Sequence, residues 1–192
     1  DQLKKIRNTY FDSLETIVKN KSNSKLYVDK LPLNIIYVGE IVRIFPNSKF
    51  ILSLRHPCDC VLSCLMQNFK PNDAMANFFN LDDAAHLYNA VMNLWTQYIS
   101  IFSINYHVIK YENLVENLET TVRPLLKFLE LPWHDSVSEF YKTAKKAAKN
   151  LNTPINWQLK IIPNIGHNYR LMGKAAAEHL YANLKVYIKR YV

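Results

Sequence analysis

The sequence predicts an α/β fold in which helices flank a small parallel sheet, and three observations support this class. Two short apolar runs, KFILSLR (49–55) and YHVIKY (106–111), are typical of strands. Helical patterns alternate with them along the chain, as in βαβ units, whose strands are parallel. The 192 residues, 49% of them apolar, fit one domain with a sizeable core, so we expect a single domain over 1–192.

The first half of the chain contains the clearest strand. Apolar residues at helical spacing predict a helix over 2–19, and KLYVDK (25–30) is a further strand candidate before a helix over about 35–44. KFILSLR has the unbroken apolar character of a strand that is buried on both faces. Pro57 suits the first turn of the next helix, which should end near Phe69.

The second half continues the alternation. A long helix is expected over 81–103, before the strand at 106–111. Pro132 marks the end of the helices that follow this strand. The remaining predicted segments are helices over 113–118 and 119–130, a basic helix over 137–149, an irregular loop over 150–170 and a last helix over about 173–191.

The chain is basic, with 24 Lys and Arg against 16 Asp and Glu and a net charge of +8. Such a surplus suits an anionic partner. Nucleic acid, a phosphorylated cofactor and a membrane surface are the three candidates. No apolar run is long enough to span a membrane. The three cysteines lie together between 58 and 64, which argues against an extracellular disulfide framework and for a cytoplasmic, reducing compartment.

The stretch LRHPCDCVLSC (54–64) gathers three thiols and a histidine, which are the residue types that zinc prefers. The usual C-x₂-C pair is missing, and Cys58 and Cys60 would point about 200° apart on a helix. Cys60 and Cys64 do share a face. Buried cysteines acting as small hydrophobic residues are therefore favoured over a metal site, and a redox pair is the weaker alternative.

Arg55 and Ser63 favour an anion site instead. Arg55 ends a strand at the edge where open α/β sheets bind ligands, and the N–H groups of the next helix should face the same crevice. Ser63 lies two turns into that helix, so its hydroxyl can face the crevice if the helix packs beside the strand. The alternative is a serine that faces solvent or bonds to its own helix.

The segment FPNSKFILSLRHPCDCVLSCLMQNF (45–69) resembles the 3′-phosphate-binding segment of the sulfotransferase family, enzymes that use 3′-phosphoadenylyl sulfate. In that family an arginine ends the strand and a serine follows eight positions later, as Arg55 and Ser63 do here. Four further segments resemble bacterial sulfotransferases in the same order: DKLPLN (29–34), NDAMANFFNLDDAAHLYNAVMNLW (72–95), YENLVENLE (111–119) and LLKFLELPW (125–133).

This resemblance implies a three-layer domain like that of the P-loop nucleotide hydrolases, which binds 3′-phosphoadenylyl sulfate or its product, adenosine 3′,5′-bisphosphate. It implies that Arg55 and Ser63 hold the 3′-phosphate. Lys30 would stabilise charge on the transferred sulfuryl group, and Tyr111 would lie near the adenine. Arg170, in NIGHNYR, would belong to a cofactor-binding loop near the C-terminus. No metal is required.

The chain also departs from the family pattern. The glycine-containing, PRSGTT-like turn that binds the 5′-phosphosulfate has no counterpart, because the only glycines are Gly39, Gly166 and Gly173. The catalytic base usually follows that turn. We therefore expect a C-terminal part of a longer sulfotransferase that lacks the first strand-loop-helix unit. Its acceptor would be a hydroxyl or amine on a protein or small molecule, and tetratricopeptide repeats would fit N-terminal to it.

A non-catalytic basic module that binds nucleic acid or another anion is the alternative. The run KTAKKAAKN (142–150) carries four lysines, and a basic patch is sufficient for sequence-independent binding. The lysines fall on one helical stripe, however, which is more typical of a solvated helix face. No aromatic RNA-binding signature or helix-turn-helix pattern accompanies them, so nucleic acid is not the expected partner.

Overall fold

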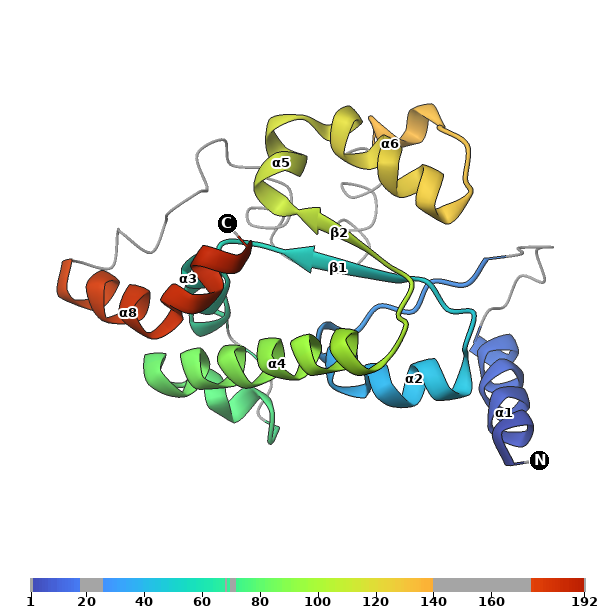
Figure 1. Cartoon of the computed structure of the whole chain (residues 1–192), viewed down its shortest axis with the longest axis horizontal. Helices are drawn as coiled ribbons and strands as arrows, with labels where there is room; N and C mark the ends of the chain where they lie inside the picture. The colour runs from blue at the N-terminus through green and yellow to red at the C-terminus, as the bar shows by residue number, and fades with distance from the viewer. Residues whose placement is uncertain (1, 18–25, 68, 70–71, 140–173, 192) are drawn as a thin grey trace. The chain divides into compact units, whose positions relative to one another are not determined.

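A computed structural model (Figure 1) describes residues 2–17, 26–67, 69, 72–139 and 174–191. The chain divides into two compact units. The first comprises residues 1–50 and 90–105, and the second comprises residues 51–89 and 106–192.

A two-stranded parallel sheet lies in the second unit. β1 (Phe50–Leu54) and β2 (Tyr106–Lys110) are hydrogen-bonded neighbours and point the same way in Figure 1. Parallel neighbours need a crossover between them, and the 51 residues from 55 to 105 supply it. The helix-rich α/β class with a small parallel sheet, and the positions of both strands, are confirmed.

The burial of β1 differs from the prediction. Successive side chains of a strand point to opposite faces. Leu52 and Leu54 are buried on one face, whereas Ile51 and Ser53 on the other face are exposed. The prediction that this strand is buried on both faces is wrong, because the serine that interrupts its apolar run lies on a solvent-exposed face.

The strand predicted at 25–30 does not form in the part of the chain that the structure describes. Residues 26–30 belong to no helix or strand, and all five are exposed. A strand is stable only when its backbone N–H and C=O groups find a neighbouring strand. The apolar, β-branched composition of this segment is therefore not sufficient to place it in the sheet.

Helices carry most of the second unit. Pro57 begins α3 at its first position, as predicted. Lys174–Tyr191, near the predicted last helix, forms α8, which packs against α3 (Figure 1). The other helices that begin in this unit are η2 (Met75–Phe78), α4 (Leu81–Ile101), α5 (Tyr111–Glu116), α6 (Leu118–Leu129) and η3 (Asp135–Val137), and α3 itself covers Pro57–Leu65. Most of the predicted helix over 137–149 and the whole loop over 150–170 lie outside the described residues.

The core of the second unit joins three helices that are distant in sequence. Its buried members come from α3, the start of α4 and α8: Cys58, Val61, Ala84, Ala85, Ala177, Leu180 and Leu184. The alanines allow the helix backbones to approach closely, and Leu180 and Leu184, one turn apart, fill the space between them. This packing supports α3, the helix that follows Arg55.

In the first unit, α1 (Gln2–Ile17) packs against α2 (Val38–Ile44), which continues directly from η1 (Pro32–Tyr37). Aromatic rings fill this contact: the ring centroids of Tyr10 and Phe45 are 5.2 Å apart, and those of Phe11 and Phe45 are 5.9 Å apart. The part of α4 from Ala90 onward contributes Tyr98, whose hydroxyl donates a hydrogen bond of 2.7 Å to the backbone carbonyl of Ile36.

Gly39 packs closely against the Tyr98 ring. A Cβ atom at Gly39 would lie 2.8 Å from Cε1 of Tyr98, and the hydroxyl of that tyrosine is already held by Ile36. We expect Gly39→Ala to displace the ring and to lower the free energy of unfolding by about 1–3 kcal/mol. Urea unfolding measures this change. Asn93→Ala, at an exposed position of α4, is the control, and equal stabilities for the two variants would contradict the packing.

Candidate functional site

Two sequence-predicted residues meet at the carboxyl ends of the strands. Arg55 directly follows β1, and Tyr111 directly follows β2. Because parallel strands end at the same edge of a sheet, the two side chains converge there. The guanidinium carbon of Arg55 lies 5.2 Å from the centroid of the Tyr111 ring, which is within the range of a cation–π contact. This contact holds the arginine at the end of the sheet.

Arg55 also retains a donor for an anion. Its Nε atom is buried and has no hydrogen-bond partner among the described residues. Leaving a buried charged donor unsatisfied is costly, by about 1–3 kcal/mol or more. A phosphate or sulfate oxygen would remove that cost, because the planar guanidinium matches the geometry of such oxyanions.

The helix α3 runs past this arginine. A side-chain hydrogen bond with Cys64, together with burial, raises the pKa of Cys60, and the same hydrogen bond lowers the pKa of Cys64; the nearby positive charge of Arg55 acts to lower both pKa values. Ser63 is half-buried and lies about 60° around the helix from Cys60. Arg55 therefore lies near the cysteine face of α3. The place of Ser63 beside an anion held by Arg55 stays a prediction.

Glu112 was not identified from the sequence, and its carboxylate accepts a hydrogen bond at the start of α3. The backbone N–H of buried His56 donates a hydrogen bond of 2.8 Å to Oε1 of Glu112, the second residue of α5. A negative charge here also complements the positive end of the α3 dipole. The expectation that the first N–H groups of this helix face an open crevice therefore does not hold at His56. The only sequence signal for this hydrogen bond is that Glu112 directly follows Tyr111, a predicted site residue.

Glu112 should stabilise the second unit. We expect Glu112→Ala to lower the free energy of unfolding by about 1–3 kcal/mol, because the buried N–H of His56 loses its acceptor. Glu116→Ala removes an exposed carboxylate from the last turn of the same helix, and it should change stability by less than about 0.5 kcal/mol. Denaturant unfolding of both variants checks this expectation. Equal effects would show that the bond from His56 contributes nothing.

The other two predicted site residues are Lys30 and Arg170. Lys30 belongs to the first unit and is exposed. Arg170 lies outside the described residues, as does the basic run 142–150. The roles that the resemblance gives to Arg55, Ser63, Tyr111, Lys30 and Arg170 therefore stay predictions.

The three cysteines have different environments. Cys58 is 0% exposed in the helical core, and burial raises the pKa of its thiol to about 12. The packing role predicted for Cys58 is confirmed. Cys60 and Cys64 lie on the face toward Arg55, so packing alone does not describe them. Within the described ranges, no group of three or more His, Cys, Asp or Glu side chains is arranged to hold a metal ion.

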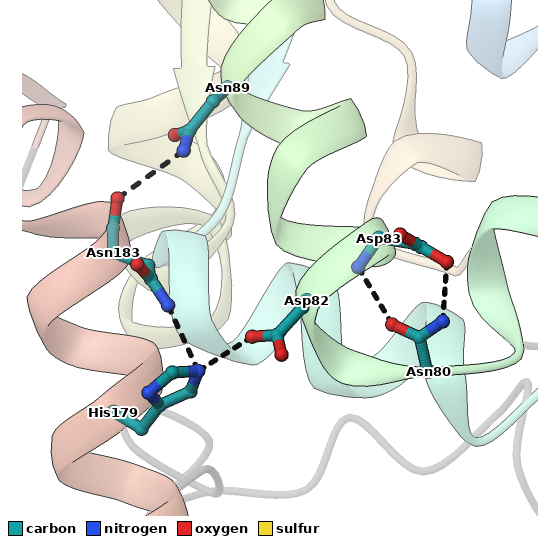
Figure 2. A network of polar contacts seen from close by, with 6 residues as sticks. All are labelled: Asn80, Asp82, Asp83, Asn89, His179 and Asn183. Atoms are coloured by element: carbon teal, nitrogen blue, oxygen red, sulfur yellow. Dashed lines mark hydrogen bonds and ion pairs between the residues drawn. The ribbon is translucent and has the colours of Figure 1, made fainter.

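A second polar cluster connects α4 and α8 (Figure 2). Nε2 of His179 lies 2.6 Å from Oδ1 of Asp82, and Nδ2 of Asn89 donates a hydrogen bond of 3.3 Å to the carbonyl of Asn183. These groups line an open cleft of about 440 Å³. The His179 and Asp82 side chains are 56% and 73% exposed, and such surface pairs contribute only about 0–1 kcal/mol. We interpret the cluster as a link between the two helices.

No helix within the described part of the chain combines the length and apolar character needed to cross a bilayer.

Comparison with known proteins identifies the family of the chain. Residues 2–135 match the model of the sulfotransferase family. An uncharacterized protein of Aquifex aeolicus (strain VF5) is 38% identical over 136 residues, which are 69% of this chain and 18% of that protein. Protein-tyrosine sulfotransferase 1 of Danio rerio is 30% identical over 135 residues, which are 70% of this chain and 37% of that enzyme.

Protein-tyrosine sulfotransferase of Drosophila melanogaster is 26% identical over 132 residues, which are 65% of this chain and 25% of that enzyme. The chain thus covers between 18% and 37% of the length of these three relatives. The family match includes β1, α3, β2 and α5, the elements that place Arg55, Ser63 and Tyr111. The chain belongs to the sulfotransferase family.

Proposed function

We propose that this chain binds the 3′-phosphate of 3′-phosphoadenylyl sulfate, within a sulfotransferase that transfers a sulfuryl group to a hydroxyl or amine acceptor. The observation that carries the proposal is Arg55, which directly follows β1, has a buried Nε without a hydrogen-bond partner among the described residues, and rests against Tyr111. The family match supports the general activity.

The residues around Arg55 suit a phosphorylated nucleoside. The guanidinium would form two parallel hydrogen bonds to the 3′-phosphate, and the Ser63 hydroxyl would donate a third. An aromatic ring has two faces. Arg55 lies over one face of Tyr111, and in this proposal the adenine would stack on the other face. The loss of the Ser63 hydroxyl alone should weaken binding less than the loss of Arg55, because its hydrogen bond lacks the full positive charge.

In the transfer step the acceptor oxygen or nitrogen attacks the sulfur, its new bond to sulfur forms, and the bond from sulfur to the bridging phosphate oxygen breaks. The leaving group is adenosine 3′,5′-bisphosphate, and a base takes the proton of the acceptor. We assign Lys30 to the negative charge that grows on the bridging oxygen. In this proposal the base and the 5′-phosphosulfate loop come from a segment outside the 192 residues, because none of these residues matches the loop.

The domain type and the further segments that we propose for the longer protein rest on the same resemblance. We propose that both units belong to one three-layer domain of the P-loop nucleotide hydrolase type, to which the longer protein adds the first strand-loop-helix unit and tetratricopeptide repeats. The three thiols are free, which suits a reducing, cytoplasmic compartment. Because two relatives are named protein-tyrosine sulfotransferases, a tyrosine hydroxyl is the first acceptor to test.

Calorimetric titration tests the binding claim. Adenosine 3′,5′-bisphosphate is titrated into the purified chain, and a random-sequence single-stranded RNA is titrated in parallel at two salt concentrations. We expect saturable binding of one bisphosphate per chain. No binding of the bisphosphate, together with RNA binding that weakens steeply with salt, would contradict the proposal and favour a basic nucleic-acid-binding module.

A further inference from the structure

Two contacts join the segment after β1 to the start of α5. The guanidinium carbon of Arg55 lies 5.2 Å from the centroid of the Tyr111 ring. The next residue of each segment makes the second contact: the backbone N–H of His56 donates a hydrogen bond of 2.8 Å to Oε1 of Glu112. The segment that carries Arg55 is thus held to α5 both by a side chain and by its backbone.

The hydrogen bond to Glu112 acts on the backbone of Arg55. The N–H of His56 belongs to the planar peptide group whose carbonyl is that of Arg55. Pairing of β1 with β2 fixes the chain before the Cα atom of Arg55, and the bond to Glu112 fixes the peptide group after it. Together they set the direction in which the arginine side chain leaves the backbone.

The other side of His56 is fixed by α3. Its carbonyl accepts a hydrogen bond of 2.9 Å from the N–H of Cys60, and Pro57 occupies the first helical position. His56 is buried, so removal of Glu112 would leave its N–H without an acceptor instead of exposing it to bulk water. A shift of this N–H toward a new acceptor would also move Arg55, because the two residues share the peptide group.

We propose that Glu112 is a positioning residue of the 3′-phosphate site, which holds the Arg55 segment in the geometry that binds the anion. The inference rests on the proposed function of Arg55. Glu112 does not touch the nucleotide in this scheme and acts through the backbone of His56. A binding residue that is already in place loses less freedom on binding, so the affinity is higher.

The negative charge of Glu112 should act against its positioning effect. The carboxylate lies beside the segment that would bind a phosphate, and like charges repel each other. If Glu112 acted only through its charge, its removal would strengthen the binding of an anion. Positioning predicts the opposite sign, because removal of the acceptor releases the Arg55 segment.

Three variants separate the acceptor from the charge, by calorimetric titration with adenosine 3′,5′-bisphosphate and adenosine 5′-monophosphate. Glu112→Ala removes the acceptor and Glu112→Asp withdraws it by one methylene. Each should weaken bisphosphate binding by about three- to tenfold and change monophosphate binding little. Glu112→Gln keeps an acceptor oxygen without the charge, so it should bind the bisphosphate at least as tightly as wild type. Glu116→Ala, at an exposed position of the same helix, should match wild type.

Two results of these titrations would overturn the positioning role. One is a full preference for the bisphosphate in both Glu112→Ala and Glu112→Asp, while Arg55→Ala has lost it. In that case the proposed function would survive and only this inference would fail. The other is an equal loss of affinity in Glu112→Gln and Glu112→Ala. If wild type itself showed no preference for the bisphosphate, the proposed function would fail and this inference with it.

Amide hydrogen exchange tests the same contact without nucleotide. Nuclear magnetic resonance measures the exchange rate of the His56 N–H, which should be slow in wild type and Glu112→Gln and at least about tenfold faster in Glu112→Asp. Equal rates in these three proteins would overturn the proposal, whatever the nucleotide titrations show. The comparison of Glu112→Asp with Glu112→Gln stands even if Glu112→Ala does not fold.

Discussion

Arg55→Ala should weaken the binding of adenosine 3′,5′-bisphosphate by about 10- to 100-fold, as measured by calorimetric titration. Hydrogen bonds to a charged group contribute about 1.5–3 kcal/mol, and about 1.4 kcal/mol corresponds to a tenfold change in affinity. The effect should be large because Arg55 is already held by Tyr111, with its guanidinium carbon 5.2 Å from the ring centroid. Little conformational entropy is then lost when the anion binds.

Two further variants separate the contribution of positive charge from that of the planar guanidinium of Arg55. Arg55→Lys keeps the positive charge but loses the planar fork, so its affinity should fall between those of wild type and Arg55→Ala. Arg43→Ala removes one exposed arginine from α2, and it should bind as the wild type does. If Arg43→Ala and Arg55→Ala weakened binding equally, the bisphosphate would respond only to the net charge of the chain.

Leu184→Ala should have the largest effect on stability, lowering the free energy of unfolding by about 2–5 kcal/mol. The Leu184 side chain is 0% exposed and belongs to the cluster in which α8 packs against α3 and the start of α4. Truncation leaves a cavity that the surrounding helices cannot fully close. Urea unfolding followed by circular dichroism measures the change.

Val186→Ala is the matched control on α8, because Val186 is 66% exposed. Its effect should stay within about 0.5 kcal/mol. A loss of less than about 1 kcal/mol for Leu184→Ala would show that α8 is not packed on α3 in solution. This result matters for the site, because α8 lies beyond the residues that match the family, 2–135, and yet supports the helix that carries Ser63.

From the sequence pattern Arg55 was expected at a strand end, whereas Tyr111 entered the candidate site through the resemblance to sulfotransferases. Each follows an apolar run with the length of a strand, and parallel neighbours end at the same edge of a sheet, so the two positions converge once the strands pair. The start of α3 was predictable for a similarly local reason, because proline is favoured at the first turn of a helix, where Pro57 lies. Such features depend on residues that are close in the sequence.

Other features depend on contacts between distant segments. Glu112 accepts the N–H of His56 across 56 positions, and no local pattern indicates this bond. The division of the cysteines, with Cys58 in the core and Cys64 beside Arg55, depends on which face of α3 meets α8. Residues 26–30 have the composition of a strand but no strand partner among the described residues, which composition cannot reveal.

The most direct test of the central claim removes the two groups of the proposed contact, the Arg55 guanidinium of the protein and the 3′-phosphate of the nucleotide, separately and together. Wild type and Arg55→Ala are each titrated with adenosine 3′,5′-bisphosphate and with adenosine 5′-monophosphate, which lacks the 3′-phosphate. Wild type should prefer the bisphosphate by at least about tenfold, and the variant should bind both nucleotides with similar affinity. If Arg55→Ala kept the full preference, or if wild type showed none, Arg55 would not be the residue that binds the 3′-phosphate.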